Sequence, residues 1–206
     1  QLGAFFFGMN VAITPAVMFA SGMRQVLVPT LARVSHDLPR QAAALKRALR
    51  VLCFIGGPVC FGVAVVSAPL VDLFWNGKWN SVIPVVQLLT IAAATRMWAT
   101  VAGIVLEAQA RWRLRAVTLS AEAILALVMA GAGAWYGVTY AADPIAMAAV
   151  FVAIQWLIVG VGHCVVSAIC LREPVHRVLL TLVPSNAIAL AAALIVAWSV
   201  MPAVRE

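Results

Sequence analysis

The chain has 206 residues, of which 65% are hydrophobic and only 10% are charged. Soluble domains carry about 25% charged residues, so this composition excludes a water-soluble globular protein and makes lipid the solvent for most of the surface. The net charge of +7 does not indicate nucleic-acid binding, because the basic residues are confined to short segments between apolar runs. Continuous apolar runs also argue against a transmembrane β-barrel, whose strands alternate apolar and polar residues.

The apolar runs are long enough for about six transmembrane helices, since a bilayer core about 30 Å thick needs roughly 20 apolar residues per helix. We therefore expect an all-α, polytopic membrane protein. The predicted helices lie at about 2–32, 51–71, 82–106, 116–138, 145–171 and 178–201. We expect the first five to form part of one bundle at residues 1–171, and residues 172–206 to add a further C-terminal helix.

The first predicted helix carries four uncharged polar side chains at helical spacing: Asn10, Thr14, Ser21 and Gln25. Separations of four and seven residues place them along one helical face, with Arg24 beside it. Such a stripe indicates that this face meets a wet cavity or a polar neighbour. For Arg24 two interpretations stay open: it lines that cavity, or its aliphatic stem lets the charge reach the nearby headgroups.

Three basic segments connect the predicted helices. Residues 33–50, 107–115 and 172–177 hold ten of the fourteen Lys and Arg residues. Because basic loops stay in the cytoplasm, we predict that these three are cytoplasmic and that the first helix runs from outside to inside. In the first segment, apolar residues recur at helical spacing between Leu38 and Leu49, which is compatible with an amphipathic helix or with a solvated connector.

Arg96 lies near the middle of predicted helix 82–106, where a charge costs at least a few kcal/mol. Glu107 falls on the same helical face, and Glu122 lies six residues into the next predicted helix. One interpretation is an ion pair between Arg96 and one of these acids. The other is a cationic site for an anionic substrate, since guanidinium binds phosphate through paired hydrogen bonds. On burial alone, Arg24 and Arg96 are the candidate substrate-binding residues.

Few other residues suggest chemistry. His163 has Ser167 one turn further on; a packed histidine is the simpler interpretation and a titrating group the alternative. The four cysteines form no CxxC pair and fall inside predicted helices, where Cys acts as a small apolar residue. Walker, GxSxG and HExxH motifs are absent, so the sequence predicts neither an enzyme, nor a cofactor, nor a metal site.

Three segments resemble a known family. They are VLVPTLARVSHDLPRQAAALKRALR at 26–50, APLVDLFWNGKWNSVIPVVQLLTIAA at 68–93 and GIVLEAQARWRLR at 103–115. In order, they are similar to motifs in the C-terminal half of oligosaccharide (polysaccharide) flippases, of the multidrug/oligosaccharidyl-lipid/polysaccharide exporter superfamily near the MATE transporters. At Ala110 the chain departs from the family pattern, which has Gly there.

The resemblance implies a fold of two six-helix bundles, of which this chain would hold part of the second plus one additional helix. On that view the sequence begins inside a longer polypeptide, and its partners are the missing N-terminal bundle, membrane lipids and a lipid-linked anionic glycan. The implied function is flipping of undecaprenyl-pyrophosphate-linked oligosaccharide across the bacterial inner membrane. Glu122 and Glu107 are then candidates for coupling to a proton or sodium gradient.

Other functions stay open. A MATE-type drug or metabolite exporter is expected to carry acids in its cavity, and Glu122 is the one deep acid in the sequence. A membrane glycan polymerase or ligase is less favoured, because the segments predicted to lie outside the membrane are short.

Overall fold

The computed structural model of the chain describes residues 2–76, 79–140, 143–184, 186–187 and 191. In these residues the regular structure is entirely helical. The elements in chain order are α1 (Leu2–Arg33), α2 (Leu38–Trp75), the short 3-10 helix η1 (Asn80–Val82), α3 (Ile83–Ala108), α4 (Trp112–Thr139), α5 (Pro144–Cys170) and α6 (Val175–Leu180).

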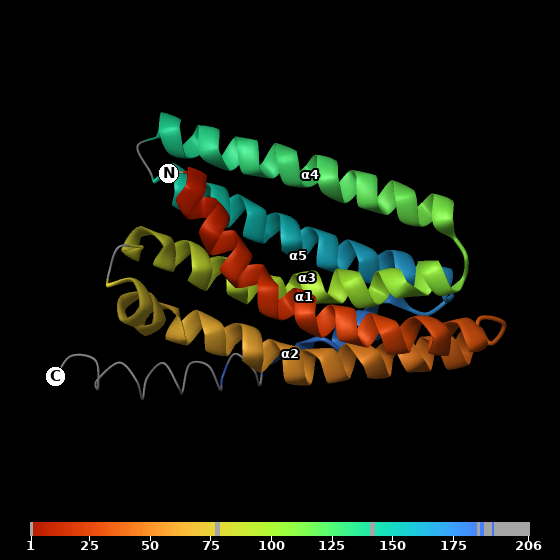
Figure 1. Cartoon of the computed structure of the whole chain (residues 1–206). Helices are drawn as coiled ribbons and strands as arrows, with labels where there is room; N and C mark the ends of the chain where they lie inside the picture. The colour runs from red at the N-terminus through yellow and green to blue at the C-terminus, as the bar shows by residue number, and fades with distance from the viewer. Residues whose placement is uncertain (1, 77–78, 141–142, 185, 188–190, 192–206) are drawn as a thin grey trace.

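Five of these helices, α1 to α5, are long and apolar enough to cross a membrane. They run side by side along one common direction (Figure 1), and each is joined to the next by a short connection. The all-α, polytopic fold expected from the sequence is therefore confirmed. The chain is a multi-pass membrane protein.

The helix expected at 51–71 begins much earlier. Residues 38–50, which the sequence placed in a loop, form the first turns of α2, so the solvated-connector interpretation is wrong and the helical one is right. Asp37 Oδ1 accepts a hydrogen bond from the Arg40 backbone N–H, and Pro39 lies in the first turn. A side-chain cap and an early proline both favour helix initiation. Leu45 and Leu49 are buried and hold this extension against the bundle.

The segment expected as a loop at 107–115 is likewise shorter than predicted. Glu107 is the second-last residue of α3, and Arg113 and Arg115 belong to the first turn of α4. Between the helices, the Ala110 and Arg111 N–H groups donate to the Glu107 and Leu106 carbonyls, and Ala110 has φ +53°. This is a Schellman-type helix end, whose left-handed residue is usually glycine.

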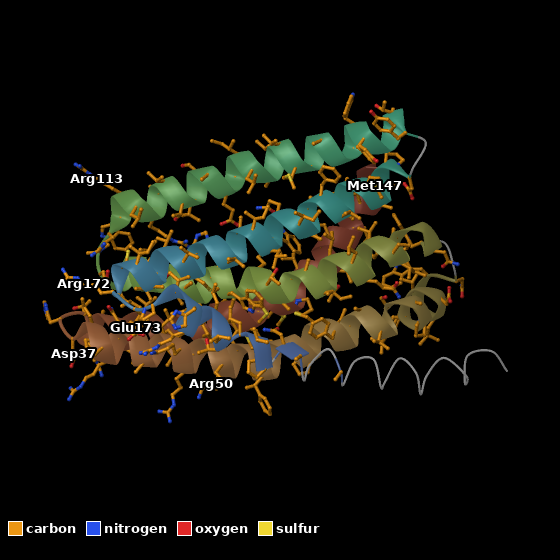
Figure 2. The ribbon with its side chains drawn as sticks, turned by 180° about the vertical axis from the view of Figure 1, so that it is seen from behind. Asp37, Arg50, Arg113, Met147, Arg172 and Glu173 are labelled. Atoms are coloured by element: carbon orange, nitrogen blue, oxygen red, sulfur yellow. The ribbon has the colours of Figure 1, made fainter. Side chains whose placement is uncertain are left out.

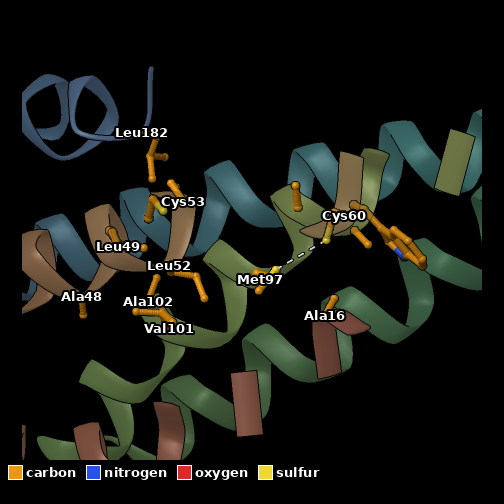
Figure 3. Close-up of a cluster of buried hydrophobic side chains, with 14 of the residues drawn as sticks. Ala16, Ala48, Leu49, Leu52, Cys53, Cys60, Met97, Val101, Ala102 and Leu182 are labelled. Carbon is orange, nitrogen blue, oxygen red and sulfur yellow. Dashed lines mark hydrogen bonds between the residues drawn. The ribbon is translucent and has the colours of Figure 1, made fainter. Parts of the chain in front are cut away.

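Helix α3 is the centre of the bundle. It packs against α1, α2 and α5, while α4 packs mainly on α5 (Figure 1). Small residues bring the backbones close: a Cβ at Gly160 of α5 would clash with the Thr95 carbonyl oxygen of α3, the kind of close approach typical of membrane helices. Buried side chains from several helices meet around Cys60 and Met97, whose sulfur atoms lie 3.9 Å apart (Figure 3).

The surface differs strongly between the sides and the ends of the bundle. Along α4, Leu127 is 77% exposed and Ile124 is 63% exposed, as expected of side chains that face lipid or other helices. At one end of the bundle lie Arg113, Arg172 and Asp37, while Met147 lies toward the other (Figure 2). The three basic segments thus share one end, and their cytoplasmic location stays a prediction.

The sixth predicted helix, 178–201, lies largely outside the described residues. Its beginning overlaps α6, which ends at Leu180 and is followed by a turn at Thr181 and Leu182. The proposed division of the chain into 1–171 and 172–206 also stays a prediction.

Candidate functional site

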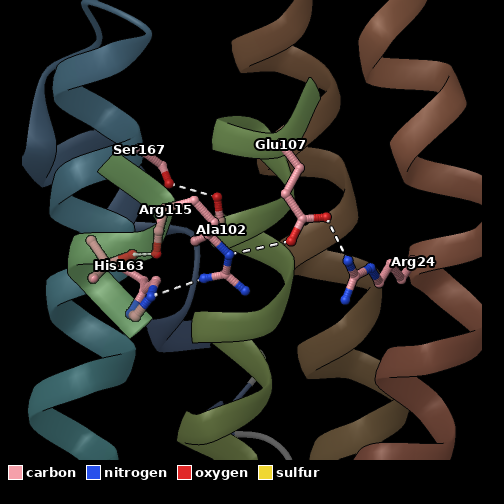
Figure 4. Close-up of polar contacts among 7 residues, drawn as sticks. Arg24, Ala102, Glu107, Arg115, His163 and Ser167 are labelled. Atoms are coloured by element: carbon pink, nitrogen blue, oxygen red, sulfur yellow. Dashed lines mark hydrogen bonds and ion pairs between the residues drawn. The ribbon is translucent and has the colours of Figure 1, made fainter. Parts of the chain in front are cut away.

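A buried carboxylate joins three helices at the basic end of the bundle. Glu107 Oε2 on α3 lies 2.9 Å from Arg24 Nη2 on α1, and its Oε1 lies 3.2 Å from Arg115 Nε on α4 (Figure 4). The Glu107 side chain is 7% exposed, that of Arg115 13% and that of Arg24 55%. Because a buried charge is tolerated only when paired, Glu107 and Arg115 depend on each other, whereas the Arg24 side chain is more than half exposed at the protein surface.

Arg115 extends the network to α5. Its Nη1 lies 3.2 Å from His163 Nε2, and His163 Nδ1 lies 3.0 Å from the Val159 carbonyl oxygen. Since a carbonyl can only accept, Nδ1 donates to it, and in the neutral ring Nε2 accepts from the guanidinium. Gly103 on α3 leaves the room that this guanidinium occupies. His163 is 5% exposed, so the packed-histidine interpretation holds, with an ionic neighbour that the sequence did not reveal.

Arg96 forms a second ion pair, about two to three turns deeper in the bundle. Its Nη1 lies 2.6 Å from Glu122 Oε1 on α4, and its guanidinium carbon lies 5.5 Å from the centre of the Trp156 ring on α5. The side chains of Arg96 and Glu122 are 33% and 15% exposed. A cation over an aromatic face gains further electrostatic stabilisation. Of the two acids offered by the sequence as partners for Arg96, the structure selects Glu122.

The two candidate arginines meet at one groove between α1 and α3. The groove has a volume of about 250 Å³, and both Arg24 and Arg96 contribute to its wall. The remaining lining is apolar or weakly polar: Ile13, Ala16, Val17, Ala20, Ser21, Met97 and Thr100. A guanidinium pair in a largely apolar groove can hold an anion whose other parts are lipid-like.

The uncharged side chains of the polar stripe on α1 bond to their own helix, and the wet cavity expected beside them stays a prediction. The Asn10, Thr14 and Ser21 side chains each donate to a carbonyl of their own helix, three or four residues earlier. They are exposed, and among them only Ser21 lines the groove. The expected polar neighbour exists for Arg24, in the form of Glu107.

Sequence reasoning missed Arg115, which was counted with the basic loop. Its spacing from Glu122, seven residues, places both on one helical face and could have indicated that it points inward. Among the described residues, no three His, Cys, Asp or Glu side chains gather closely enough to hold a metal ion.

Comparisons with known proteins agree with this membrane architecture. Residues 1–84 match a family described as "Polysaccharide biosynthesis protein". The chain is similar to such proteins. It is 33% identical over 109 residues to the lipopolysaccharide biosynthesis protein WzxC of Escherichia coli K12, a match that covers 53% of this chain and 22% of that protein.

A second relative comes from Klebsiella pneumoniae and is described as an uncharacterized membrane protein in the cps region. It is 31% identical over 113 residues, which cover 55% of this chain and 23% of the relative. The matched part of the chain thus spans less than a quarter of either relative. No solved structure matches the chain significantly.

Proposed function

We propose that this chain is part of a flippase that carries a lipid-linked anionic oligosaccharide, of the undecaprenyl-pyrophosphate type, across the bacterial inner membrane for cell-surface polysaccharide biosynthesis. A role in cell-surface polysaccharide biosynthesis is supported by the similarity to a lipopolysaccharide biosynthesis protein and to a membrane protein from a cps region. In the proposal, the rest of the protein provides the opposite wall of the transport cavity.

The charge balance around the groove is the observation that carries the proposal. The guanidinium groups of Arg24, Arg96 and Arg115 face only two carboxylates, those of Glu107 and Glu122. One positive charge is therefore left over among the described residues of this network. A pyrophosphate diester carries two negative charges, so it balances this network once one of the two carboxylates is protonated, and it offers several oxygens to the guanidinium hydrogen-bond donors.

In this mechanism the two acids hold the arginines in place between transport cycles. The substrate phosphates compete with Glu107 for Arg24 and with Glu122 for Arg96, while the lipid tail stays in the bilayer beside the apolar part of the groove. Protonation of either acid weakens its ion pair and frees the arginine, which gives Glu107 and Glu122 their role in ion coupling. Rocking of the two bundles then exposes the cavity to the other side.

The test uses the natural full-length protein in a strain that lacks it, with surface polysaccharide and protein level measured together. Arg96→Ala is expected to lower export at least tenfold at equal protein level, because the charge in the groove is lost. Arg96→Lys keeps the charge without the two-pronged geometry and should fall in between. Glu122→Gln should lower export as well, because a glutamine resembles a permanently protonated acid and so removes the coupling to protonation.

Arg113→Ala is the matched control, since Arg113 is an exposed arginine at the end of the same bundle and should export normally. Normal export by the Arg96→Ala protein would remove Arg96 from the mechanism.

A further inference from the structure

A second basic depression lies at the surface between α1, α2 and α6, away from the groove described above. It is open, with a volume of about 930 Å³. Its lining combines basic and apolar side chains: Met23, Leu27, Thr30, Ala43, Ala44, Lys46, Arg47, Ala48, Arg50, Val51 and Arg177. None of the candidate transport residues belongs to it.

The three guanidinium groups of this depression have no ion-pair partner among the described residues. Arg47, Arg50 and Arg177 are exposed, and the ion pairs among the described residues include none of them. The fourth base differs, because Lys46 Nζ lies 3.1 Å from Glu173 Oε2. That pair fastens the segment before α6 against α2 and so places Arg177 at the depression. Three like charges around one depression repel one another, and a bound anion relieves that repulsion.

The length of α2 places these arginines near a membrane boundary. Its 38 residues are nearly twice the roughly 20 needed to cross a hydrocarbon core about 30 Å thick, and Trp75 at its far end suits the interfacial aromatic belt. The turns that carry Arg47 and Arg50 therefore lie toward the opposite boundary, where the phosphate groups of lipids in that leaflet begin.

The apolar part of the depression lies beside this basic part. Met23 and Leu27 of α1 are partly buried, and Val51 of α2 is exposed. These side chains form a surface that an acyl chain can cover, directly next to the arginines. A free phosphate uses only the basic half, whereas a phospholipid uses both.

We propose that this depression binds an anionic phospholipid of the leaflet at the basic end of the bundle. Its phosphate contacts Arg47, Arg50 and Arg177, and an acyl chain lies along Met23, Leu27 and Val51. Basic pockets between transmembrane helices are suited to anionic headgroups. The site is distinct from the groove between α1 and α3 and does not rest on the transport function.

The test is binding of phosphatidylglycerol to the natural full-length protein in detergent, measured by native mass spectrometry. Phosphatidylcholine with the same acyl chains is the comparison lipid, and inorganic pyrophosphate is the soluble anion. The wild-type protein should prefer phosphatidylglycerol. The double variant Arg47→Ala/Arg50→Ala should bind it about 30-fold more weakly, which corresponds to about 2 kcal/mol.

The matched control is Arg33→Ala/Arg113→Ala, which removes two exposed arginines outside the depression; its affinity should stay within about twofold of wild type. Equal weakening in both double variants, equal binding of the two lipids, or displacement of the lipid by inorganic pyrophosphate would each overturn the proposal. If the Arg47/Arg50 variant cannot be purified, Arg177→Ala tests the same site from α6 and should weaken binding about fivefold.

Discussion

Glu107 provides the sharpest test of the buried network. The substitution Glu107→Gln keeps the size of the side chain and removes the charge that Arg24 and Arg115 share. Arg115, whose side chain is 13% exposed, then has no acid within ion-pair distance among the described residues. Its remaining partner, His163, offers one acceptor nitrogen and no charge in the neutral ring.

The expected loss of stability in Glu107→Gln depends on how far the side chains of its two arginine partners are buried. Removing one partner of a buried ion pair costs about 3–5 kcal/mol, and the pair between Glu107 and Arg115 is of this kind. The Arg24 side chain is 55% exposed, so we count its share as that of a surface ion pair, at most about 1 kcal/mol. Because the glutamine amide oxygen still accepts one hydrogen bond, we expect a total near the lower limit, about 3 kcal/mol.

The assay is thermal unfolding of the natural full-length protein in detergent, followed by fluorescence. A loss of about 3 kcal/mol lowers the Tm by about 6–12 °C for a folding unit of 150–250 residues, and by less if a larger unit unfolds together. Asp37→Asn is the matched control. It removes the charge from an exposed ion pair with Arg40 but keeps the oxygen that caps α2, so it should cost less than about 1 kcal/mol.

A double variant separates the effect of an unpaired buried charge on stability from the effect of changed side-chain packing. In Glu107→Gln/Arg115→Gln no unpaired buried charge remains, so the double variant should be more stable than Glu107→Gln alone. Equal Tm shifts for Glu107→Gln and Asp37→Asn would refute the reasoning, since they would mean that burial adds nothing to the ion pair.

Two further predictions concern the turn after α3 and the orientation of the bundle. Ala110 has φ +53°, a left-handed backbone conformation that is unfavourable for alanine but not for glycine. Ala110→Gly should therefore stabilise the protein by about 0.5–1 kcal/mol, measured as a rise in Tm. The same change at Ala116, inside α4, should instead destabilise it by about 1 kcal/mol. Single cysteines at Arg113 and Tyr140, at opposite ends of α4, should react with a membrane-impermeant thiol reagent from opposite sides, with Tyr140→Cys labelled in intact cells. The four cysteines of this chain are buried and should stay unlabelled, and labelling of Arg113→Cys from outside would reverse the orientation.

The positions of the membrane helices could be predicted because the length of an apolar run is enough to locate them. An apolar run of about 20 residues must satisfy its backbone hydrogen bonds internally in lipid, so run length alone located α1 to α5. The start of α2 could not be fixed by hydropathy, because residues 38–50 are polar on one face. The local signals for that start, Asp37 and Pro39, are present in the sequence and agree with the observed cap.

The ion pairs were harder to predict, because they depend on how each helix is rotated about its axis. The sequence offered Glu107 and Glu122 as equal partners for Arg96, and only packing distinguishes them: α4 lies against α5, which brings Glu122 beside Arg96 and Trp156. Arg115 was missed because its neighbours Arg111 and Arg113 are exposed. In a segment with several charged residues at a helix end, the sequence does not show which one of them points into the bundle.

The pairing also changes how the four candidate residues should be understood. The sequence assigned substrate binding to Arg24 and Arg96, and ion coupling to Glu107 and Glu122, as separate roles. In the structure each arginine is paired with one of these acids, so an anion that binds an arginine competes with a carboxylate, and a proton that neutralises a carboxylate weakens its ion pair with the arginine. Linkage is reciprocal: if protonation strengthens anion binding, anion binding strengthens protonation to the same extent. Under the proposed function, substrate binding and protonation of these acids would therefore favour each other.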